Sequence, residues 1–356
     1  MARTTSDEVE FVRDLSQPSG IKKHWDGRSD SVLGLQGAWL INSRLSAIVQ
    51  ATTKYRSDRT YNPEVAWAYL RYEPTPNTTL RLGRLGTEFF MMADSRWVGY
   101  SYLTVRPPGD YFWYLPFYSI NGGDAAYAMP VGEGMLRVKA FYGLSNGQIP
   151  LADKQWDISG SPMTGGHVEY LFSSWQIRAS YANITFRHDL PIGDLLQAYS
   201  PDPVASTAYL STRNSRSDYY SLGVVYDQGP VQVQLMLNRI EQGSNSFESS
   251  EGGYVLAGYR FGEVKPYLGY SWIRSVKRNT QGRQFIEAKI MADGHADQDA
   301  RIVGVRWDFA RNLALKAQWD RIHGDPTSIF PYRNDPANGR WSGRMDVYSM
   351  TLDFVF

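Results

Sequence analysis

Cysteine is absent from this chain of 356 residues, which excludes disulfide bonds and thiol catalysis and removes the thiolate ligands of metal sites. Long hydrophobic runs are absent as well, because no stretch reaches the 18 apolar residues that a transmembrane helix needs. An excess of charge of either sign is also missing, since 37 Lys and Arg stand against 36 Asp and Glu. Balanced charge gives no general attraction to nucleic acid, so we expect no nucleic-acid partner.

Aromatic residues, in contrast, are abundant: they make up 14% of the chain, with 24 Tyr and 11 Trp. The mean hydropathy is −0.41, which fits a soluble all-β protein. It fits a membrane β-barrel equally well, because alternate residues of a barrel strand face lipid and a polar interior. The periodicity of the sequence therefore has to separate the two classes.

From residue 31 onward the sequence divides into alternating runs of about ten residues, the length that a tilted strand needs to cross a bilayer. Short turns and longer polar loops connect these runs in alternation, which is typical of barrels with short periplasmic turns and long extracellular loops. The predicted hairpins are 31–41 with 45–55, 64–73 with 78–85, 122–129 with 135–144, 165–172 with 175–187, 219–227 with 231–242, 252–261 with 265–276 and 300–309 with 313–322, and the last strand is 345–356. The predicted long loops are 56–63, 88–121, 145–163, 188–217, 243–250, 277–298 and 323–343.

Seven hairpins and one final strand make fifteen strands, whereas a closed antiparallel barrel needs an even number. We expect a sixteenth strand either within residues 1–15 or upstream of them, with 17–30 as the first outer loop. Residues 1–12 also lack the apolar core of a signal peptide. This predicts that the chain is numbered after processing or that its beginning has been removed.

The segment 88–121 is too long for a turn and too aromatic for a solvated loop. Pro107, Pro108 and Pro116 rule out a continuous helix or a central strand through its second half. So many aromatic side chains need an interior to pack into. We therefore predict one all-β domain over residues 1–356, a transmembrane antiparallel β-barrel of sixteen strands, with 88–121 folded inside it as a constriction.

Two features of the chain resemble the sixteen-stranded porin superfamily of Gram-negative bacteria. The last strand carries Tyr348, Met350, Leu352 and Phe354 on one face and ends on Phe356, like the C-terminal signal that the outer-membrane barrel assembly machinery reads. If a first strand is counted, 88–121 becomes the third outer loop, the loop that folds into the lumen in those porins.

This resemblance covers residues 31–356 and lies in the topology rather than in a short motif. It implies a location in the bacterial outer membrane, contact with membrane lipid and lipopolysaccharide, and recognition by the assembly machinery through Phe356. It also implies a homotrimer. The short loop 56–63 departs from porins whose second loop latches a neighbouring subunit.

In a diffusion channel, the selective residues line the narrowest point. Strand parity predicts a basic inner wall where 88–121 leaves the barrel, formed by Arg81, Arg137, Lys139 and Arg178, with fewer acids in the corresponding positions of that wall. Acids of the segment would face it and produce a crosswise field. The full predicted pore-lining set is Arg81, Arg84, Glu88, Asp94, Arg96, Arg106, Asp110, Tyr111, Arg137, Lys139, Arg178, Arg306 and Lys316.

Two alternatives remain open for these residues. The charges can pair with one another and hold the segment in place without any role in selectivity. The aromatic cluster 111–114 can offer a stacking surface to sugars or amphipathic substrates, or it can simply anchor the segment.

An enzymatic function finds little support in the sequence. The five histidines are His24, His167, His188, His295 and His323, and nearly all fall in predicted outer loops. Neither a Gly-x-Ser-x-Gly motif nor EF-hand spacing is present, so we expect no catalysis, no metal and no cofactor. The predicted function is passive diffusion of small hydrophilic solutes with a weak preference for anions. The alternatives are a channel for amphipathic or hydrophobic molecules, and a rim enzyme or adhesin.

Overall fold

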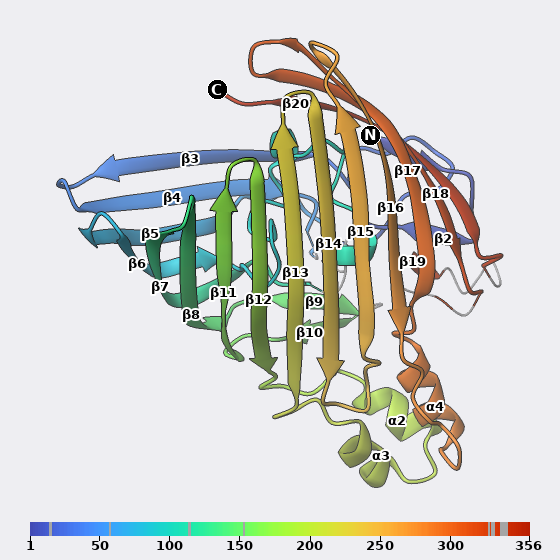
Figure 1. The fold of residues 1–356 in the computed structure, drawn as a ribbon. Helices are drawn as coiled ribbons and strands as arrows, with labels where there is room; N and C mark the ends of the chain where they lie inside the picture. The colour runs from blue at the N-terminus through green and yellow to red at the C-terminus, as the bar shows by residue number, and fades with distance from the viewer. Residues whose placement is uncertain are drawn as a thin grey trace.

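The computed structural model describes residues 1–13, 16–56, 58–112, 115–151, 154–326, 328, 332–334 and 341–356. Within these residues sixteen strands form one antiparallel sheet, which curls around a central space (Figure 1). In their order along the sheet, the strands are β1 (Ala2–Thr4), β20 (Arg344–Phe354), β18 (Leu313–Gly324), β17 (Asp297–Ala310), β16 (Val264–Ser275), β15 (Ser250–Tyr259), β14 (Val231–Gln242), β13 (Arg216–Gln228), β12 (Trp175–Thr185), β11 (Pro162–Phe172), β8 (Gly134–Ser145), β7 (Ser119–Val131), β6 (Thr78–Gly86), β5 (Glu64–Thr75), β4 (Leu45–Lys54) and β3 (Val32–Leu40). All the predicted hairpins are confirmed, because both members of each are antiparallel neighbours in this order.

The sixteenth strand is β1, and it lies within residues 1–15. It runs antiparallel to β20, with Ala2 opposite Ser349 and Thr4 opposite Val347. It is only three residues long. The first and last strands of the chain therefore lie side by side in the wall.

In strands such as β8, β14, β18 and β20, side chains alternate between a more buried inner face and a more exposed outer face. In β20, Val347 is 0% exposed, whereas the neighbouring Tyr348 is 43% exposed. In β14, Gln234 and Met236 are buried and Leu235 is exposed. A two-residue period of this kind, with apolar residues outside, is the pattern of strands that face lipid.

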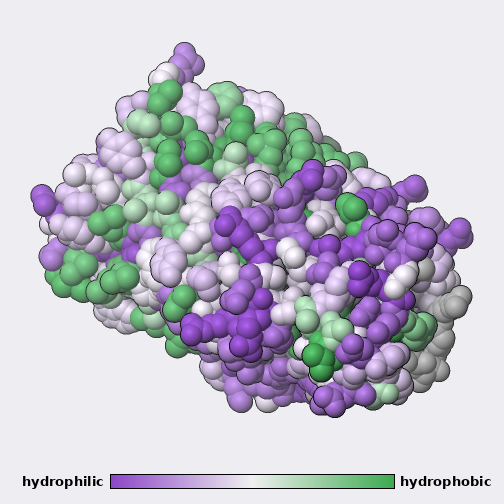
Figure 2. Space-filling model, turned by 90° about the horizontal axis from the view of Figure 1, so that it is seen from below, coloured by the Kyte–Doolittle hydropathy of each residue, from purple (hydrophilic) through white to green (hydrophobic). Residues whose placement is uncertain are grey.

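The two ends of the barrel differ. At one end the hairpins close by tight turns, in which Gly229 and Asn312 adopt positive φ angles of 54° and 66°, a backbone conformation that glycine and asparagine tolerate. The other end carries the long loops with α2 (Gly193–Tyr199), α3 (Pro203–Leu210) and α4 (Phe285–Ala292), which lie together in Figure 1. Seen from this end, hydrophilic side chains cover the central and right parts of the surface, and hydrophobic ones gather at the upper left (Figure 2).

Shorter elements lie among these loops. β9 (Gln148–Leu151) pairs with β10 (Lys154–Asp157), and β2 (Val9–Phe11) pairs with β19 (Tyr332–Asn334). None of the helices in the described part of the chain is long and apolar enough to cross a membrane.

Of the predicted segment 88–121, residues 88–112 and 115–118 lie inside the curled sheet, whereas 119–121 already belong to β7 in the wall. The inner residues include η1 (Gly99–Ser101) and α1 (Gly109–Phe112), and α1 contacts the strands from β14 to β17. The aromatic side chains pack on inner faces of the wall: Phe89 lies 5.1 Å from Tyr219 of β13, and Tyr111 lies 5.4 Å from Tyr254 of β15, both measured between ring centroids. The main hydrophobic core of the protein is therefore the contact between this segment and the wall.

Candidate channel interior

The predicted basic wall is present, but acids of the same wall neutralise much of it. Arg81 lies opposite Asp124 in the β6–β7 register, and its Nη2 is 2.5 Å from Asp124 Oδ2 and 2.9 Å from Glu88 Oε1. Lys139 pairs with Glu88 and lies 3.2 Å from Asp124. Two cations and two carboxylates thus form one cluster, which attaches the start of 88–121 to the wall.

The other two predicted wall cations share one carboxylate. Arg178 Nη2 lies 2.6 Å from Glu169 Oε1, whereas Arg137 Nη1 is 3.7 Å from Glu169 Oε2. The side chain of Arg137 remains 50% exposed. The wall carries fewer acids than cations, but Asp124 and Glu169 stand directly across the strands from the basic residues and pair with them.

Parity could have identified both acids from the sequence. Asp124 and Glu169 occupy inward positions of the predicted strands 122–129 and 165–172, although the pairing itself depends on the register between neighbouring strands. The structure contains ion pairs of the kind that would hold the segment in place, since Arg81 and Lys139 both pair with Glu88.

On the opposite wall the basic residues hold the backbone of the segment. Lys316 is 0% exposed and donates to the carbonyl oxygens of Gly99 and Thr104 at 2.7 and 3.0 Å. Arg306 Nη1 donates to the carbonyl oxygens of Tyr100 and Tyr102. A buried cation that faces main-chain oxygens satisfies groups that water would otherwise have to reach.

Carboxylates attach the second half of the segment to its surroundings through side-chain hydrogen bonds and ion pairs. Asp110 accepts hydrogen bonds from Ser271 Oγ of β16 and Gln298 Nε2 of β17, both at 2.6 Å. Arg106 donates to Asp30 at 2.8 Å, to Asp320 at 3.2 Å and to Ser349. The segment is therefore tied to both sides of the barrel.

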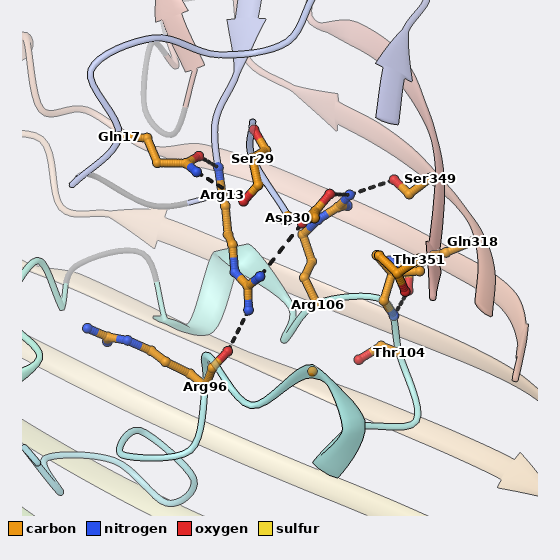
Figure 3. Close-up of polar contacts among 12 residues, drawn as sticks. Arg13, Gln17, Ser29, Asp30, Arg96, Thr104, Arg106, Gln318, Ser349 and Thr351 are labelled. Carbon is orange, nitrogen blue, oxygen red and sulfur yellow. Dashed lines mark hydrogen bonds and ion pairs between the residues drawn. The ribbon is translucent and has the colours of Figure 1, made fainter. Parts of the chain in front are cut away.

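The predicted first outer loop, 17–30, follows β1 but is partly folded against this segment. Figure 3 shows Arg13 directed toward Asp30 and toward the carbonyl oxygen of Arg96, with Nη1 3.8 Å from Asp30 Oδ1 and Nη2 2.5 Å from the Arg96 oxygen. Gln17 is buried and donates to the Ser29 carbonyl. Residues 13, 17, 29 and 30 are thus part of a second inward-folded stretch of the chain, which sequence reasoning missed because this stretch shows no aromatic enrichment.

A cavity of about 1300 Å³ lies between 88–121 and the strands β3, β4 and β5. It extends from Gln148 and Ser159, near the long loops, to Phe354 and Phe356 at the end with the tight turns. Its charged lining residues are of both signs: Arg13, Asp30, Lys54, Arg56, Glu64, Arg84, Asp94 and Asp353.

Cations and aromatic rings alternate on one side of this cavity. Lys54 Nζ lies 3.6 Å from the ring centroid of Tyr118 and 4.3 Å from that of Trp97, and it also lies 3.3 Å from Glu64 Oε1. The guanidinium carbon of Arg13 lies over the same Trp97 ring, 4.2 Å from its centroid. Cations over aromatic faces are stabilised by the ring quadrupole, which gives this wall defined side-chain positions.

The predicted pore-lining residues divide into two groups. Arg84 and Asp94 line the cavity, whereas Arg96, Arg106, Asp110 and Tyr111 are buried in contacts of the inner segment. Trp113 and Tyr114 of the predicted aromatic cluster lie outside the described residues. Sequence reasoning missed the residues of the cavity that come from β4, β5 and β20, namely Lys54, Glu64, Trp67 and Asp353.

The histidines do not gather into one site. His167 lies inside β11, within the predicted strand 165–172, and is buried. His295 Nδ1 lies 2.6 Å from Glu248 Oε2 in the long loops. Within the described residues, no group of His, Cys, Asp and Glu side chains is arranged to hold a metal ion.

No protein-family model and no curated protein matches the chain. Solved structures do match. The anion-selective porin of Comamonas acidovorans aligns with a TM-score of 0.57 at 13% identity over 93% of this chain and 91% of that one. OmpT, an outer-membrane protein of Vibrio cholerae, aligns at 0.56 and 14% over 99% and 94%.

The outer-membrane channel DcaP of Acinetobacter baumannii also aligns, with a TM-score of 0.55 at 11% identity over 92% of this chain and 85% of that one. One of the three is described as a porin and the other two as an outer-membrane protein and an outer-membrane channel, and identities this low establish the fold rather than a shared substrate. The agreement extends over nearly the whole wall of sixteen strands. The chain therefore has the fold of the Gram-negative outer-membrane porins, a transmembrane antiparallel β-barrel.

Proposed function

We propose that the protein is a channel of the bacterial outer membrane through which small hydrophilic solutes diffuse passively. The observation that carries this proposal is the cavity between 88–121 and the strands β3 to β5, which reaches from the long loops toward the tight turns and is lined by charged side chains. Porins from two other bacteria share the fold. We further propose that the protein is not an enzyme and that one barrel forms one conducting unit.

Segment 88–121 is proposed to act as the constriction. Its aromatic core with β13, β14 and β15 fills that side of the barrel, so the solute path is confined to the side of β3, β4 and β5. The path is then bordered by Trp97 and Tyr118 of the segment and by Lys54 and Glu64 of the wall. Its selectivity depends on the radius at these side chains and on their charges.

A weak preference for anions is proposed, and Arg84 supports it from within the cavity. Arg137 does not line this cavity, but it is half exposed and its carboxylate partner Glu169 is held more closely by Arg178, so its charge adds to the field of the lumen. Arg84 lines the cavity, and its Nε has no hydrogen-bond partner among the described residues. Asp94 in the same cavity opposes them, so the preference is mild.

A trimer is proposed on the strength of one related structure, since the Vibrio cholerae OmpT is also described in a trimer form. That structure aligns with a TM-score of 0.52 at 14% identity over 90% of each chain. Membrane lipid, lipopolysaccharide and the barrel assembly machinery are the proposed partners of the outer wall and of Phe356.

The absence of native cysteine makes the proposed path testable by single-cysteine labelling. Gln50→Cys places a thiol on the cavity, whereas the neighbouring Val49→Cys places one on the outer face. In planar bilayers we expect a bulky methanethiosulfonate reagent to lower the single-channel conductance of Gln50→Cys and to leave Val49→Cys unchanged. An unchanged conductance of fully labelled Gln50→Cys would place the path elsewhere.

A channel for amphipathic molecules is the second candidate, because the cavity continues through the wall between β3 and β20. Outward-facing Leu33, Leu35, Met350 and Leu352 line it together with inward-facing Thr351. Such an opening would let a molecule with an apolar part leave sideways into lipid. In Gln50→Cys, a detergent-like solute that enters this path should reduce the ion current. Loss of that inhibition after the thiol is labelled would favour this candidate.

A further inference from the structure

Aromatic rings line the cavity between the inner segment and the strands β3 to β5. In the described part of the chain, all but one of these rings contact a second ring or a cation: Tyr61, Trp97, Tyr100, Phe117, Tyr118, Phe354 and Phe356. The exception is Trp67 of β5. No ring or cation of the described residues lies over its indole, and its N–H donates to none of their polar atoms. Trp67 thus offers the cavity both an apolar surface and a donor.

Two amide side chains continue the wall beside this ring. The register between β4 and β5 places Gln50 opposite Trp67, and the register between β3 and β4 places Gln36 opposite Gln50. Gln50 Nε2 donates to Gln36 Oε1 at 3.2 Å. This bond leaves the oxygen of Gln50 as an acceptor and the amide group of Gln36 as a donor. Both side chains line the same cavity as Trp67.

A carboxylate lies on the other side of the indole. Asp94 of the inner segment lines the cavity and forms no hydrogen bond or ion pair with other described residues. It meets Trp67 at Gly86 of β6, where a Cβ atom would lie 2.8 Å from Trp67 Nε1 and 3.2 Å from Asp94 Cβ. The indole N–H and the carboxylate therefore converge on one place, and glycine leaves the room for both.

We propose that four side chains of the cavity form a binding subsite for a neutral sugar ring: Gln36, Gln50, Trp67 and Asp94. The inference rests on the proposed channel, because the subsite lies on its solute path. Along this row the free groups alternate between donor and acceptor. A sugar hydroxyl both donates and accepts, so a ring with several hydroxyls satisfies the whole row. The apolar C–H face of the same sugar can pack on the indole, which combines an apolar body with a polar N–H.

Other classes of solute fit these groups less well. The carboxylate of Asp94 repels an anion at this place. An apolar solute would leave the donors and acceptors of the row without partners, which costs free energy. A zwitterionic amino acid is the main competitor, because Arg84 also lines the cavity. Of the predicted stacking cluster 111–114, Tyr111 and Phe112 are buried, so Trp67 is the ring that a sugar can reach.

The test measures how maltotriose reduces the ion current of the unmodified protein in planar bilayers. Poly(ethylene glycol) of similar size is the control for simple filling of the pore, and L-phenylalanine is the control for a zwitterion. We expect a saturable reduction by maltotriose, with half of the effect at a concentration about tenfold below that of the polymer. Equal effects of sugar and polymer would overturn the proposal. A stronger effect of L-phenylalanine than of maltotriose would overturn it in favour of a zwitterion site.

Two pairs of variants locate the subsite. Trp67→Leu should raise the half-effect concentration of maltotriose about tenfold, since a ring that stacks on a ligand contributes about this much. Tyr61→Leu removes a ring of the same cavity that already stacks on Tyr55 and should change it little. Gly86→Ala places a methyl group between Trp67 and Asp94 and should also weaken the effect. Gly34→Ala is its control, because a Cβ there lies at an ordinary 3.6 Å from Thr52 Cγ2. Equal changes within either pair would refute the assignment.

Two further measurements keep the test independent of conduction and of any one variant. The heat-dependent shift in gel mobility checks that each variant folds, and the comparison of probes on the unmodified protein stands if Trp67→Leu does not. Calorimetric titration of the detergent-folded protein with maltotriose reports binding without current. Conductance without saturable reduction by sugar and without calorimetric binding would refute the subsite and leave the channel. Sugar binding that Trp67→Leu weakens, in a protein without conductance, would support the subsite and refute the channel.

Discussion

Arg106 offers a sharp test of how the inner segment is held. Its side chain is buried, with Nε and Nη2 2.9 and 2.8 Å from the two carboxylate oxygens of Asp30 and with Nη1 3.2 Å from Asp320 Oδ2. The substitution Arg106→Met keeps an unbranched apolar stem but removes the charge. Asp30 and Asp320 are then left buried without their main cation.

Removing one partner of a buried ion pair typically costs about 3–5 kcal/mol, because the remaining charge is uncompensated. Arg13 lies 3.8 Å from Asp30 and partly compensates it. We therefore expect Arg106→Met to lower the free energy of unfolding by about 3 kcal/mol, the low end of that range. The measurement is the denaturant midpoint of the detergent-folded protein, followed by tryptophan fluorescence.

A matched control lies on the exposed part of β5. Arg71 Nη2 is 2.5 Å from Glu73 Oε1, but both side chains are more than two-fifths exposed. Exposed pairs contribute only about 0–1 kcal/mol, so Arg71→Met should have little effect. Adding Asp30→Asn and Asp320→Asn to Arg106→Met should restore part of the lost stability. An effect of Arg106→Met no larger than that of Arg71→Met would refute the reasoning.

Three further predictions concern selectivity, assembly and the outer loops. Arg81→Gln combined with Arg137→Gln should move the reversal potential in a dilute KCl gradient toward cations, and the shift should shrink at about 1 M salt, where the Debye length is about 3 Å; a shift toward anions would contradict it. Deleting Phe356 should leave unfolded periplasmic protein, and heat-modifiable barrel in the outer membrane would count against the predicted signal. Partial burial raises the pKa of Asp189, but hydrogen bonds from Ser211 Oγ and two backbone N–H groups outweigh burial and lower the pKa. The stabilisation from ionised Asp189 is present above the unfolded pKa of about 3.9 and is lost as pH falls through the lower folded pKa. Proteolysis of loop 188–217 should therefore accelerate as pH falls below the folded pKa. The acceleration should be smaller in Asp189→Asn.

Much of the wall could be predicted because its signal is local. Each strand carries a two-residue period, and each tight turn follows from a few residues such as Asn312 or Gly229. The last strand shows this most clearly, since Tyr348 and Met350 are exposed while Val347 and Ser349 are buried, as the alternation predicted. Neighbouring hairpins in the sequence are neighbours in the sheet, so no long-range information was needed to order them.

The interior depends on contacts between residues far apart in the sequence. Asp124 neutralises Arg81 only because the register between β6 and β7 brings them opposite each other. Asp30 forms an ion pair with Arg106 only because the N-terminal stretch and the segment that begins at Glu88 both fold inward and contact each other.

By itself, the sequence determined an antiparallel β-barrel with lipid-facing alternation, an aromatic segment that must be buried, and a C-terminal strand ending on Phe356. Only the tertiary structure decided on which side of that segment the cavity lies and which cations remain exposed. The physical reason is that strand periodicity is encoded over a few residues, whereas the charge lining a channel is the sum over ion pairs that register and packing create.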